Sequence, residues 1–184
     1  MDYVYHGSPV GGLAFIEPKI STHGKNWVYA TKNKSIALVY LQRWNDFIFN
    51  QSINSNGQQE LTERLPNAFE DTYAGKSGFL YYLSAANFLE GQTSFLAEVV
   101  SDKKEQVVYC EAINDCYEKL REMERNNEII LFRYPNRPSR IPFDDSDLIK
   151  KAKCILERSN DKKRSIDNFI KSNPMLKDAF LSLG

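Results

Sequence analysis

Short strand-like segments recur along the first 134 residues without regular helices between them, and this pattern constrains the fold more than any other feature. Each segment alternates in hydrophobicity or is rich in aromatics, and each is bounded by Gly, Pro, Asn or Ser, as strands closed by turns are. A parallel sheet needs a crossover helix between successive strands. The pattern therefore predicts an α+β fold with antiparallel pairing, and its strands are expected at 2–6, 27–31, 79–83, 95–100, 107–110 and 129–134.

Helical periodicity is predicted in two places within this part of the chain. Asn33 is placed to cap a helix over 34–44, in which Ile36, Val39 and Tyr40 share one face. A second helix is predicted to begin near Ile113 and to end near Asn126. Two polar or glycine-containing segments are predicted to be surface loops, namely 50–57 and 67–78.

Three prolines separate this part from the C-terminal residues. Pro135, Pro138 and Pro142 each bias the preceding residue away from helical geometry, so 135–143 is predicted to be a linker. The expected organisation is a body at 1–134, the linker, and a helical appendage at 144–184. The appendage is expected to dock on the body through an apolar stripe comprising Leu148, Ile155, Phe169 and Phe180.

Composition narrows the choice of partners. The chain has 184 residues with 24 basic and 24 acidic side chains. This balance provides no long-range field for nucleic acid or anionic lipid, so neither a nucleic acid nor a membrane is an expected partner. The three cysteines have no metal-ligand spacing, and no metal is expected. No secretory or membrane-spanning segment is visible, which favours a cytoplasmic protein, although a toxin exported without a cleaved signal would look the same.

Four sequence features are spaced so that they can meet in one pocket. The run Tyr5-His6-Gly7-Ser8 ends the first strand, Tyr29 lies in the second, Tyr40 follows eleven residues later on the predicted helix, and Glu98 lies in a late strand. Glu98 is the clearest anomaly, because it interrupts an apolar run and a buried carboxylate is costly unless it is paired.

This order and spacing resemble the ADP-ribosyltransferase fold, in its diphtheria-toxin-like and poly(ADP-ribose) polymerase-like branch. The resemblance covers about residues 3–110 and is carried by His6-Gly7-Ser8, Tyr29, Tyr40 and Glu98. The chain is also similar to small uncharacterised bacterial proteins with a Tyr-His-Gly-Ser start, a Val-Tyr-Ala-Thr or Val-Tyr-Ala-Ser segment and a Glu-x-Val-Ser strand. The resemblance implies a split antiparallel β-sandwich that takes NAD as its substrate.

The resemblance assigns catalytic roles to Glu98 and His6. Cleavage of the nicotinamide–ribose bond passes through an oxocarbenium-like transition state. Glu98 would accept a hydrogen bond from the ribose 2′-hydroxyl and stabilise the developing positive charge. Tyr29 and Tyr40 would stack on the two faces of the nicotinamide. The backbone of Gly7 would bind the carboxamide.

The adenosine half of NAD would contact the same strand end. By resemblance, His6 would hydrogen-bond the adenosine ribose and Ser8 would contact that region. Two positions depart from the family pattern, because Trp27 replaces a glycine and Ala37 replaces a residue whose hydroxyl binds the nicotinamide amide. Thr31 or Ser8 would have to supply that hydroxyl.

Several functions remain open at this point. The first is an NAD-dependent mono-ADP-ribosyltransferase or NAD glycohydrolase, with NAD or a related nucleotide and a protein acceptor as partners. Leu96 stands two residues before Glu98, where arginine-directed members carry a Glu or Gln, so arginine is not the expected acceptor. The second is a catalytically silent nucleotide- or protein-binding module of the same fold. The third is a structural domain in which His6, Tyr29 and Tyr40 serve only packing.

Overall fold

The chain forms two compact units in the computed structural model, which describes residues 2–20, 24–42, 44–93, 95–158 and 161–181. The first unit comprises Met1–Trp44, Ile53–Gln59 and Phe69–Ile130. The second comprises Asn45–Ser52, Glu60–Ala68 and Leu131–Gly184. This division differs from the predicted boundary at residue 134, because two internal segments belong to the same unit as the C-terminal residues.

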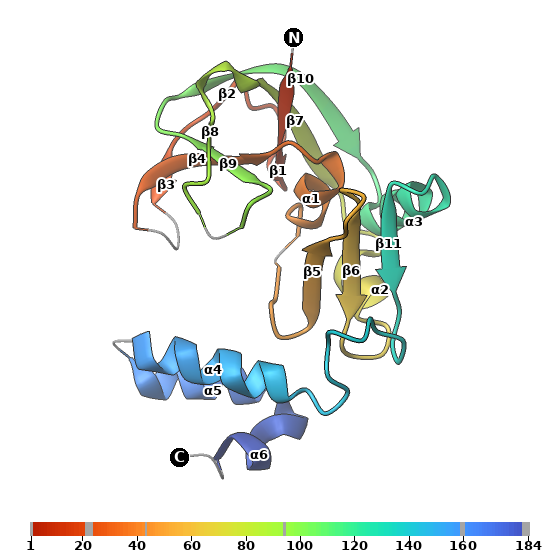
Figure 1. Cartoon of the computed structure of the whole chain (residues 1–184). Coiled ribbons are helices and arrows are strands. Elements are labelled where there is room, and N and C mark those ends of the chain that lie inside the picture. The colour runs from red at the N-terminus through yellow and green to blue at the C-terminus, as the bar shows by residue number, and fades with distance from the viewer. Residues whose placement is uncertain (1, 21–23, 43, 94, 159–160, 182–184) are drawn as a thin grey trace. The chain divides into compact units, whose positions relative to one another are not determined.

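The first unit is built on an eight-stranded sheet in which all of the described pairs are antiparallel (Figure 1). The strand order is β2-β10-β7-β1-β4-β9-β8, with β3 paired to β4. The prediction of a mixed fold with antiparallel pairing is therefore confirmed at this level. The strands are β1 (Tyr3–Ser8), β2 (Phe15–Ile16), β3 (Lys19–Ile20), β4 (Asn26–Thr31), β7 (Gly78–Ser84), β8 (Leu89–Glu90), β9 (Glu98–Ser101) and β10 (Glu105–Ile113).

Two helices of this unit begin at side-chain caps. The sequence predicts the cap at Asn33, whereas the second predicted helix begins at Cys116 rather than near Ile113, which ends a strand. The Asn33 carboxamide accepts a hydrogen bond from the backbone N–H of Ser35, and Asp115 accepts from Tyr117 and Glu118. Each cap satisfies amides that would otherwise lack an intrahelical partner. The helices are α1 (Lys34–Val39), α2 (Ala68–Tyr73), the 3-10 turn η1 (Ala85–Asn87) and α3 (Cys116–Arg125).

The first helix is shorter than the sequence predicts. It ends at Val39 rather than Trp44, and in a tightened last turn the N–H of Tyr40 bonds to the carbonyl of Ala37 and the N–H of Leu41 bonds to that of Leu38. The carbonyl of Val39 instead accepts a hydrogen bond of 3.1 Å from the buried hydroxyl of Tyr73. A partner distant in sequence thus satisfies a carbonyl that the next helical turn would have used.

Two predicted loops are wrong. Residues 49–53 form strand β5 (Phe49–Ile53) within the segment read as a loop, and α2 lies within 67–78. Strand β6 (Gln59–Glu63) was not predicted. Strand β1 also continues two residues beyond His6, because Gly7 and Ser8 pair with β7. Polar residues mask β5 and β6 in the sequence, whereas pairing with neighbouring strands stabilises both in the fold.

The two faces of the large sheet differ in character. One face carries an apolar cluster, made of Val4, Ile16, Val28, Ala30, Tyr81, Leu83 and Val99. On the other face, cross-strand register aligns one residue from each of five neighbouring strands, which we call the register row. The register row comprises Tyr109, Tyr82, Tyr5, Thr31 and Glu98. Cross-strand partners share a face, so these side chains lie on the face opposite the apolar cluster.

The second unit combines a small sheet with the C-terminal helices. Most residues of the three-stranded sheet, ordered β11-β6-β5 with β11 at Ile129–Phe132, belong to this unit. The helical core contains Ile149, Ala152, Phe169 and Phe180, and the ring of Phe47 meets that of Phe169 edge-on at 5.0 Å. Leu148, of the predicted docking stripe, is buried, whereas the side chain of Ile155 lies outside the described part of the chain. The helices are α4 (Ser146–Arg158), α5 (Lys162–Ser172), the 3-10 turn η2 (Pro174–Leu176) and α6 (Lys177–Leu181).

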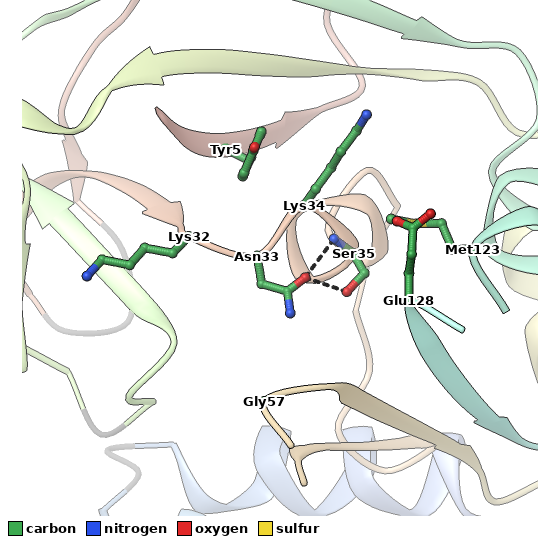
Figure 2. A pocket seen from close by; sticks show the side chains of 8 residues that line it. All are labelled: Tyr5, Lys32, Asn33, Lys34, Ser35, Gly57, Met123 and Glu128. Carbon is green, nitrogen blue, oxygen red and sulfur yellow. Dashed lines mark hydrogen bonds between the residues drawn. The ribbon is translucent and has the colours of Figure 1, made fainter. Parts of the chain in front are cut away.

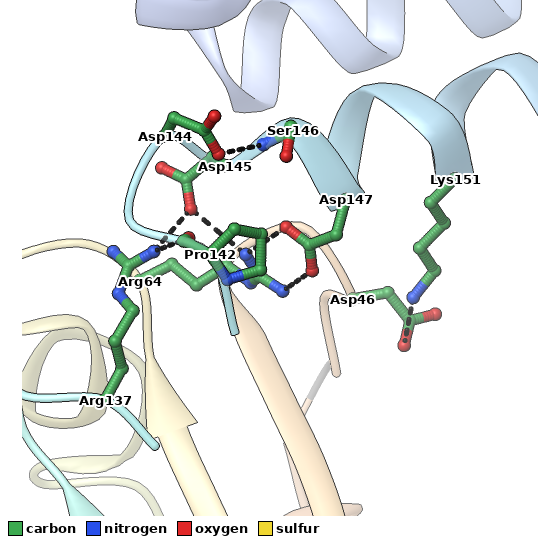
Figure 3. Close-up of polar contacts among 9 residues, drawn as sticks. All are labelled: Asp46, Arg64, Arg137, Pro142, Asp144, Asp145, Ser146, Asp147 and Lys151. Carbon is green, nitrogen blue, oxygen red and sulfur yellow. Dashed lines mark hydrogen bonds and ion pairs between the residues drawn. The ribbon is translucent and has the colours of Figure 1, made fainter. Parts of the chain in front are cut away.

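A buried ion network joins the start of α4 to the residue that follows β6 (Figure 3). The Arg64 side chain is only 2% exposed and forms a two-point contact with the carboxylate of Asp147. Arg64 also bonds Asp145 at 3.0 Å, and Asp145 accepts from Arg137 at 2.7 Å. Guanidinium groups buried this completely need paired acceptors, because an unpaired charge in the interior is costly.

The predicted linker is also held within this unit. The backbone N–H of Tyr134 donates to Glu63 at 2.9 Å, and Arg140 pairs with Glu60 at 2.6 Å. Together with the Arg64 contacts, these bonds tie residues 134–147 to β6 and to the residue after it. The proline-rich segment is thus a strap packed against the small sheet, rather than a free connector.

We expect Asp147→Ala to lower the free energy of unfolding by about 2–3 kcal/mol, because it leaves a buried guanidinium with half of its partners. Asp46→Ala is the matched control, since Asp46 pairs with Lys151 at the surface with side-chain exposures of 58% and 41%. Exposed pairs of this kind contribute little, so the control should change stability by less than about 0.5 kcal/mol. Urea denaturation measures both, and equal small losses would contradict the role given to the Arg64 network.

Candidate functional site

The predicted site residues lie around the junction of β1 and β4. The described ladder between these strands contains a single pair, Tyr5 with Thr31. Beyond that pair, a side chain rather than the backbone bridges the strands, because the Nδ1–H of His6 donates to the carbonyl of Tyr29 at 2.7 Å. The chain therefore holds β1 and β4 together through an imidazole at the point where their ladder stops.

Glu98 lies on the same face of the sheet as Thr31 and Tyr29. Thr31 pairs directly with Glu98 across β4 and β9, and Tyr29 lies two residues earlier on β4. The register row places Tyr5 two strands away from Glu98, at about 10 Å between Cα atoms from the usual strand spacing. Three of the predicted residues, Tyr29, Thr31 and Glu98, are thus brought together on one face.

His6 takes the opposite face of β1. It pairs with Tyr81, a member of the apolar cluster, and strand alternation turns its side chain away from the face that carries Tyr5. Burial lowers the pKa of His6, and the bond to the Tyr29 carbonyl only partly opposes this effect. The ring is therefore neutral at pH 7, with its proton on Nδ1 and an acceptor lone pair on Nε2.

A glycine is needed at position 7 for a packing reason that the sequence does not reveal. A Cβ atom added at this position would lie 2.1 Å from the carbonyl oxygen of Ala37 and 3.3 Å from Leu41. Helix α1 therefore lies directly on the strand at Gly7, and only glycine permits this approach. Gly78, on the neighbouring strand, meets Leu41 in the same way at 3.1 Å.

The remaining predicted residues are scattered around this junction. Ser8 is buried and its hydroxyl accepts from the N–H of Val10, so it stabilises the turn that follows β1. The Thr31 hydroxyl likewise accepts from the N–H of Asn33. Tyr40 follows the C-terminal end of α1 and is 39% exposed, with its ring 5.9 Å from that of Trp44.

A pocket of about 420 Å³ lies beside Tyr5, at the other end of α1 (Figure 2). It falls within the range of roughly 300–1,000 Å³ that is usual for small-molecule sites. None of the seven predicted site residues lines it. Its walls come from Tyr5, Lys32, Asn33, Lys34, Ser35, Gly57, Met123 and Glu128.

The ammonium group of Lys34 is bound by a neighbouring cluster of Glu111 and Tyr82. It pairs with Glu111 and lies 5.5 Å over the ring of Tyr82, whose hydroxyl donates to Glu111 at 3.0 Å. Burial alone would lower the pKa of Lys34, but its bonds to Glu111 and Tyr82 raise it on balance. Lys34 therefore stays charged and contributes mainly its aliphatic stem to the pocket. Sequence reasoning missed this cluster, because its members lie on separate elements.

Comparisons with known proteins give no information on the function of this chain. No family model matches the chain, and no curated protein or solved structure is similar to it at a significant level. Within the described residues, no group of three or more His, Cys, Asp or Glu side chains is arranged to hold a metal ion. None of the described helices has the length and hydropathy needed to span a membrane.

We expect Gly7→Ala to lower the free energy of unfolding by about 3 kcal/mol, because the new methyl group would overlap a helix carbonyl. Gly91→Ala is the control, since Gly91 has a left-handed φ of 68° and open space around it. Backbone strain alone should cost the control about 1 kcal/mol. If chemical denaturation found the two variants equally stable, α1 would not be held against β1 at Gly7.

We also expect His6 to make stability depend on pH. The unfolded chain binds a proton at His6 near pH 6.5, whereas the folded ring resists protonation, so stability falls as the pH drops through that value. The slope is at most about 1.4 kcal/mol per pH unit for one such group. His6→Gln should flatten the profile measured by urea denaturation between pH 7.5 and 5, while His23→Gln controls for loss of the other histidine. An unchanged slope in His6→Gln would contradict this assignment.

Proposed function

We propose that this protein cleaves the nicotinamide–ribose bond of NAD, as a mono-ADP-ribosyltransferase or an NAD glycohydrolase. The observation that carries the proposal is the placement of Glu98 beside Thr31 and Tyr29, on one face of the sheet next to the point where the β1–β4 ladder stops. The resemblance of the sequence to the ADP-ribosyltransferase fold supplies the chemistry. An antiparallel sheet interrupted at β1 is compatible with the split sandwich of that fold.

The proposed reaction needs one carboxylate. The C1′–N bond of NAD breaks, its electron pair leaves with nicotinamide, and an oxygen nucleophile then bonds to C1′ and loses its proton. Glu98 would accept a hydrogen bond from the ribose 2′-hydroxyl, and this bond strengthens as positive charge develops on the ribose ring. Tyr29, on the same face, would stack against the nicotinamide.

The proposal gives His6 a positioning role. Its Nδ1–H is bound to the Tyr29 carbonyl, so the imidazole fixes the backbone that carries Tyr29. Its ring lies on the face opposite Glu98, so in this proposal His6 acts on NAD only through the backbone of Tyr29. Tyr40 would need to reach the nicotinamide from the C-terminal end of α1.

One observation favours the catalytically silent alternative. In the proposal the backbone of Gly7 binds the carboxamide. Ala37 lies directly against Gly7, but its methyl side chain has no hydroxyl to bind the nicotinamide amide. A pocket without that hydroxyl would hold nicotinamide weakly. In this alternative the chain binds a nucleotide or a protein without cleaving NAD.

Nicotinamide release distinguishes the two alternatives. We expect Glu98→Gln to reduce the release of nicotinamide from NAD by about 10²–10³-fold, since it removes one preorganised charge while keeping the side-chain shape. NAD affinity should change little. Tyr29→Ala should instead weaken NAD binding, because a stacking surface is lost.

Glu118→Gln is the matched control, because Glu118 is an exposed carboxylate on α3 that pairs with Arg121 at the surface. Its turnover should equal that of the wild type. Equal turnover in Glu98→Gln and the wild type would refute the role of Glu98. NAD binding without any nicotinamide release by the wild type would support the silent alternative.

A further inference from the structure

The pocket beside Tyr5 carries a second inference, which does not depend on NAD cleavage. Its lining has an aromatic ring, a primary amide and a carboxylate, contributed by Tyr5, Asn33 and Glu128. Lys32 also lines it, with its ammonium group turned away from Asn33 in Figure 2. A flat heterocycle with hydrogen-bonding edges and an attached anion matches such a set. We propose that this pocket binds a nucleoside monophosphate.

Asn33 presents a hydrogen-bond donor to the pocket. Its Oδ1 accepts from the backbone N–H of Ser35 at 3.0 Å and from the Ser35 hydroxyl at 2.6 Å. A backbone N–H can only donate, so these bonds fix the orientation of the amide. Figure 2 shows the amide nitrogen on the side away from Ser35, toward Gly57. Asn33 therefore offers its NH₂ group to a carbonyl or ring nitrogen of a base.

Glu128 supplies acceptors. One of its oxygens accepts from the Asn126 amide at 3.2 Å, and the side chain lines the same pocket as Asn33. A carboxylate recognises adjacent N–H groups, and the Watson–Crick edge of guanine carries two of these beside a carbonyl. Guanine can therefore use both the Asn33 donor and the Glu128 acceptors.

Tyr5 and Lys32 complete the match. The Tyr5 ring is half-buried and is held edge-on to Tyr82 at 5.0 Å, so it forms a fixed surface for a base. Lys32 pairs with Glu90 in an exposed contact, with side-chain exposures of 58% and 66%. Such pairs are weak, and the ammonium group can exchange Glu90 for a phosphate. Lys34 cannot take this role, because Glu111 holds its charge.

Calorimetric titration of the full chain with GMP tests the site. We expect GMP to bind, and Asn33→Asp and Glu128→Gln each to weaken its binding about tenfold through loss of base contacts. Asn33→Asp retains an acceptor for Ser35, so the cap of α1 persists and thermal stability should be unchanged. Glu118→Gln again serves as the control, with unchanged affinity for GMP.

The phosphate contact is tested with guanosine as a second probe. The wild type should bind GMP more tightly than guanosine, and Lys32→Gln should remove that difference without weakening guanosine binding. A pentanucleotide of guanosine and uridine then distinguishes the source of the ligand. Tighter, salt-sensitive binding of the oligonucleotide would assign the site to a nucleic-acid end, and equal binding would assign it to a free nucleotide.

Three results would overturn the proposal. One is no GMP binding at millimolar concentration, and another is unchanged GMP affinity in both Asn33→Asp and Glu128→Gln. The third is full displacement of GMP by NAD, which would make the pocket part of the dinucleotide site. Equal NAD turnover in Glu98→Gln and the wild type, with GMP binding intact, would refute the role of Glu98 and leave the nucleotide site standing, so the two proposals fail independently.

Discussion

The close approach of α1 to β1 at Gly7 determines the geometry of the first unit. The helix carbonyl of Ala37 occupies space that any other side chain at Gly7 would fill, and Leu41 packs against Gly7 and Gly78. This contact sets the helix over one end of the sheet face. The N-terminal end of α1 then lies beside Tyr5 and forms the wall of the pocket. The same contact explains why a glycine follows His6 without reference to any ligand.

The junction of β1 and β4 follows from this arrangement. The backbone ladder holds at Tyr5 and Thr31, and beyond it the His6 ring takes over by bonding the Tyr29 carbonyl. A half-buried histidine used in this way has a structural role, because its neutral ring donates a hydrogen bond to a main-chain carbonyl. It also affects the candidate site, because its bond to the Tyr29 carbonyl fixes the strand whose opposite face carries Tyr29 and Thr31. Both roles are compatible in one residue, and the chemistry assigned to Glu98 requires only that this junction stays rigid.

In the second unit, buried ion pairs hold the proline-rich segment in place, whereas in the first unit a close backbone contact positions α1. Arg64 and Arg137 are both almost fully buried, and the aspartates at the start of α4 neutralise them. Asp145 adopts a left-handed backbone with a φ of 53°, which aspartate tolerates better than most residues. Its carboxylate accepts from both guanidinium groups. The proline-rich segment is thereby fixed to the small sheet, which composition alone did not indicate.

The sequence by itself determined the antiparallel α+β character, the cap at Asn33, and the strands that carry Tyr29 and Glu98, because local periodicity and side-chain caps act within a few residues. It did not predict β5, β6 or α2, whose polar residues are stabilised by partners distant in the chain. Only the tertiary structure decided which predicted site residues share a face. A register fixed by neighbouring strands aligned Glu98, Thr31 and Tyr5, and strand alternation turned His6 to the face of the apolar cluster. The pocket likewise depends on elements more than fifty residues apart, and no local pattern encodes their meeting.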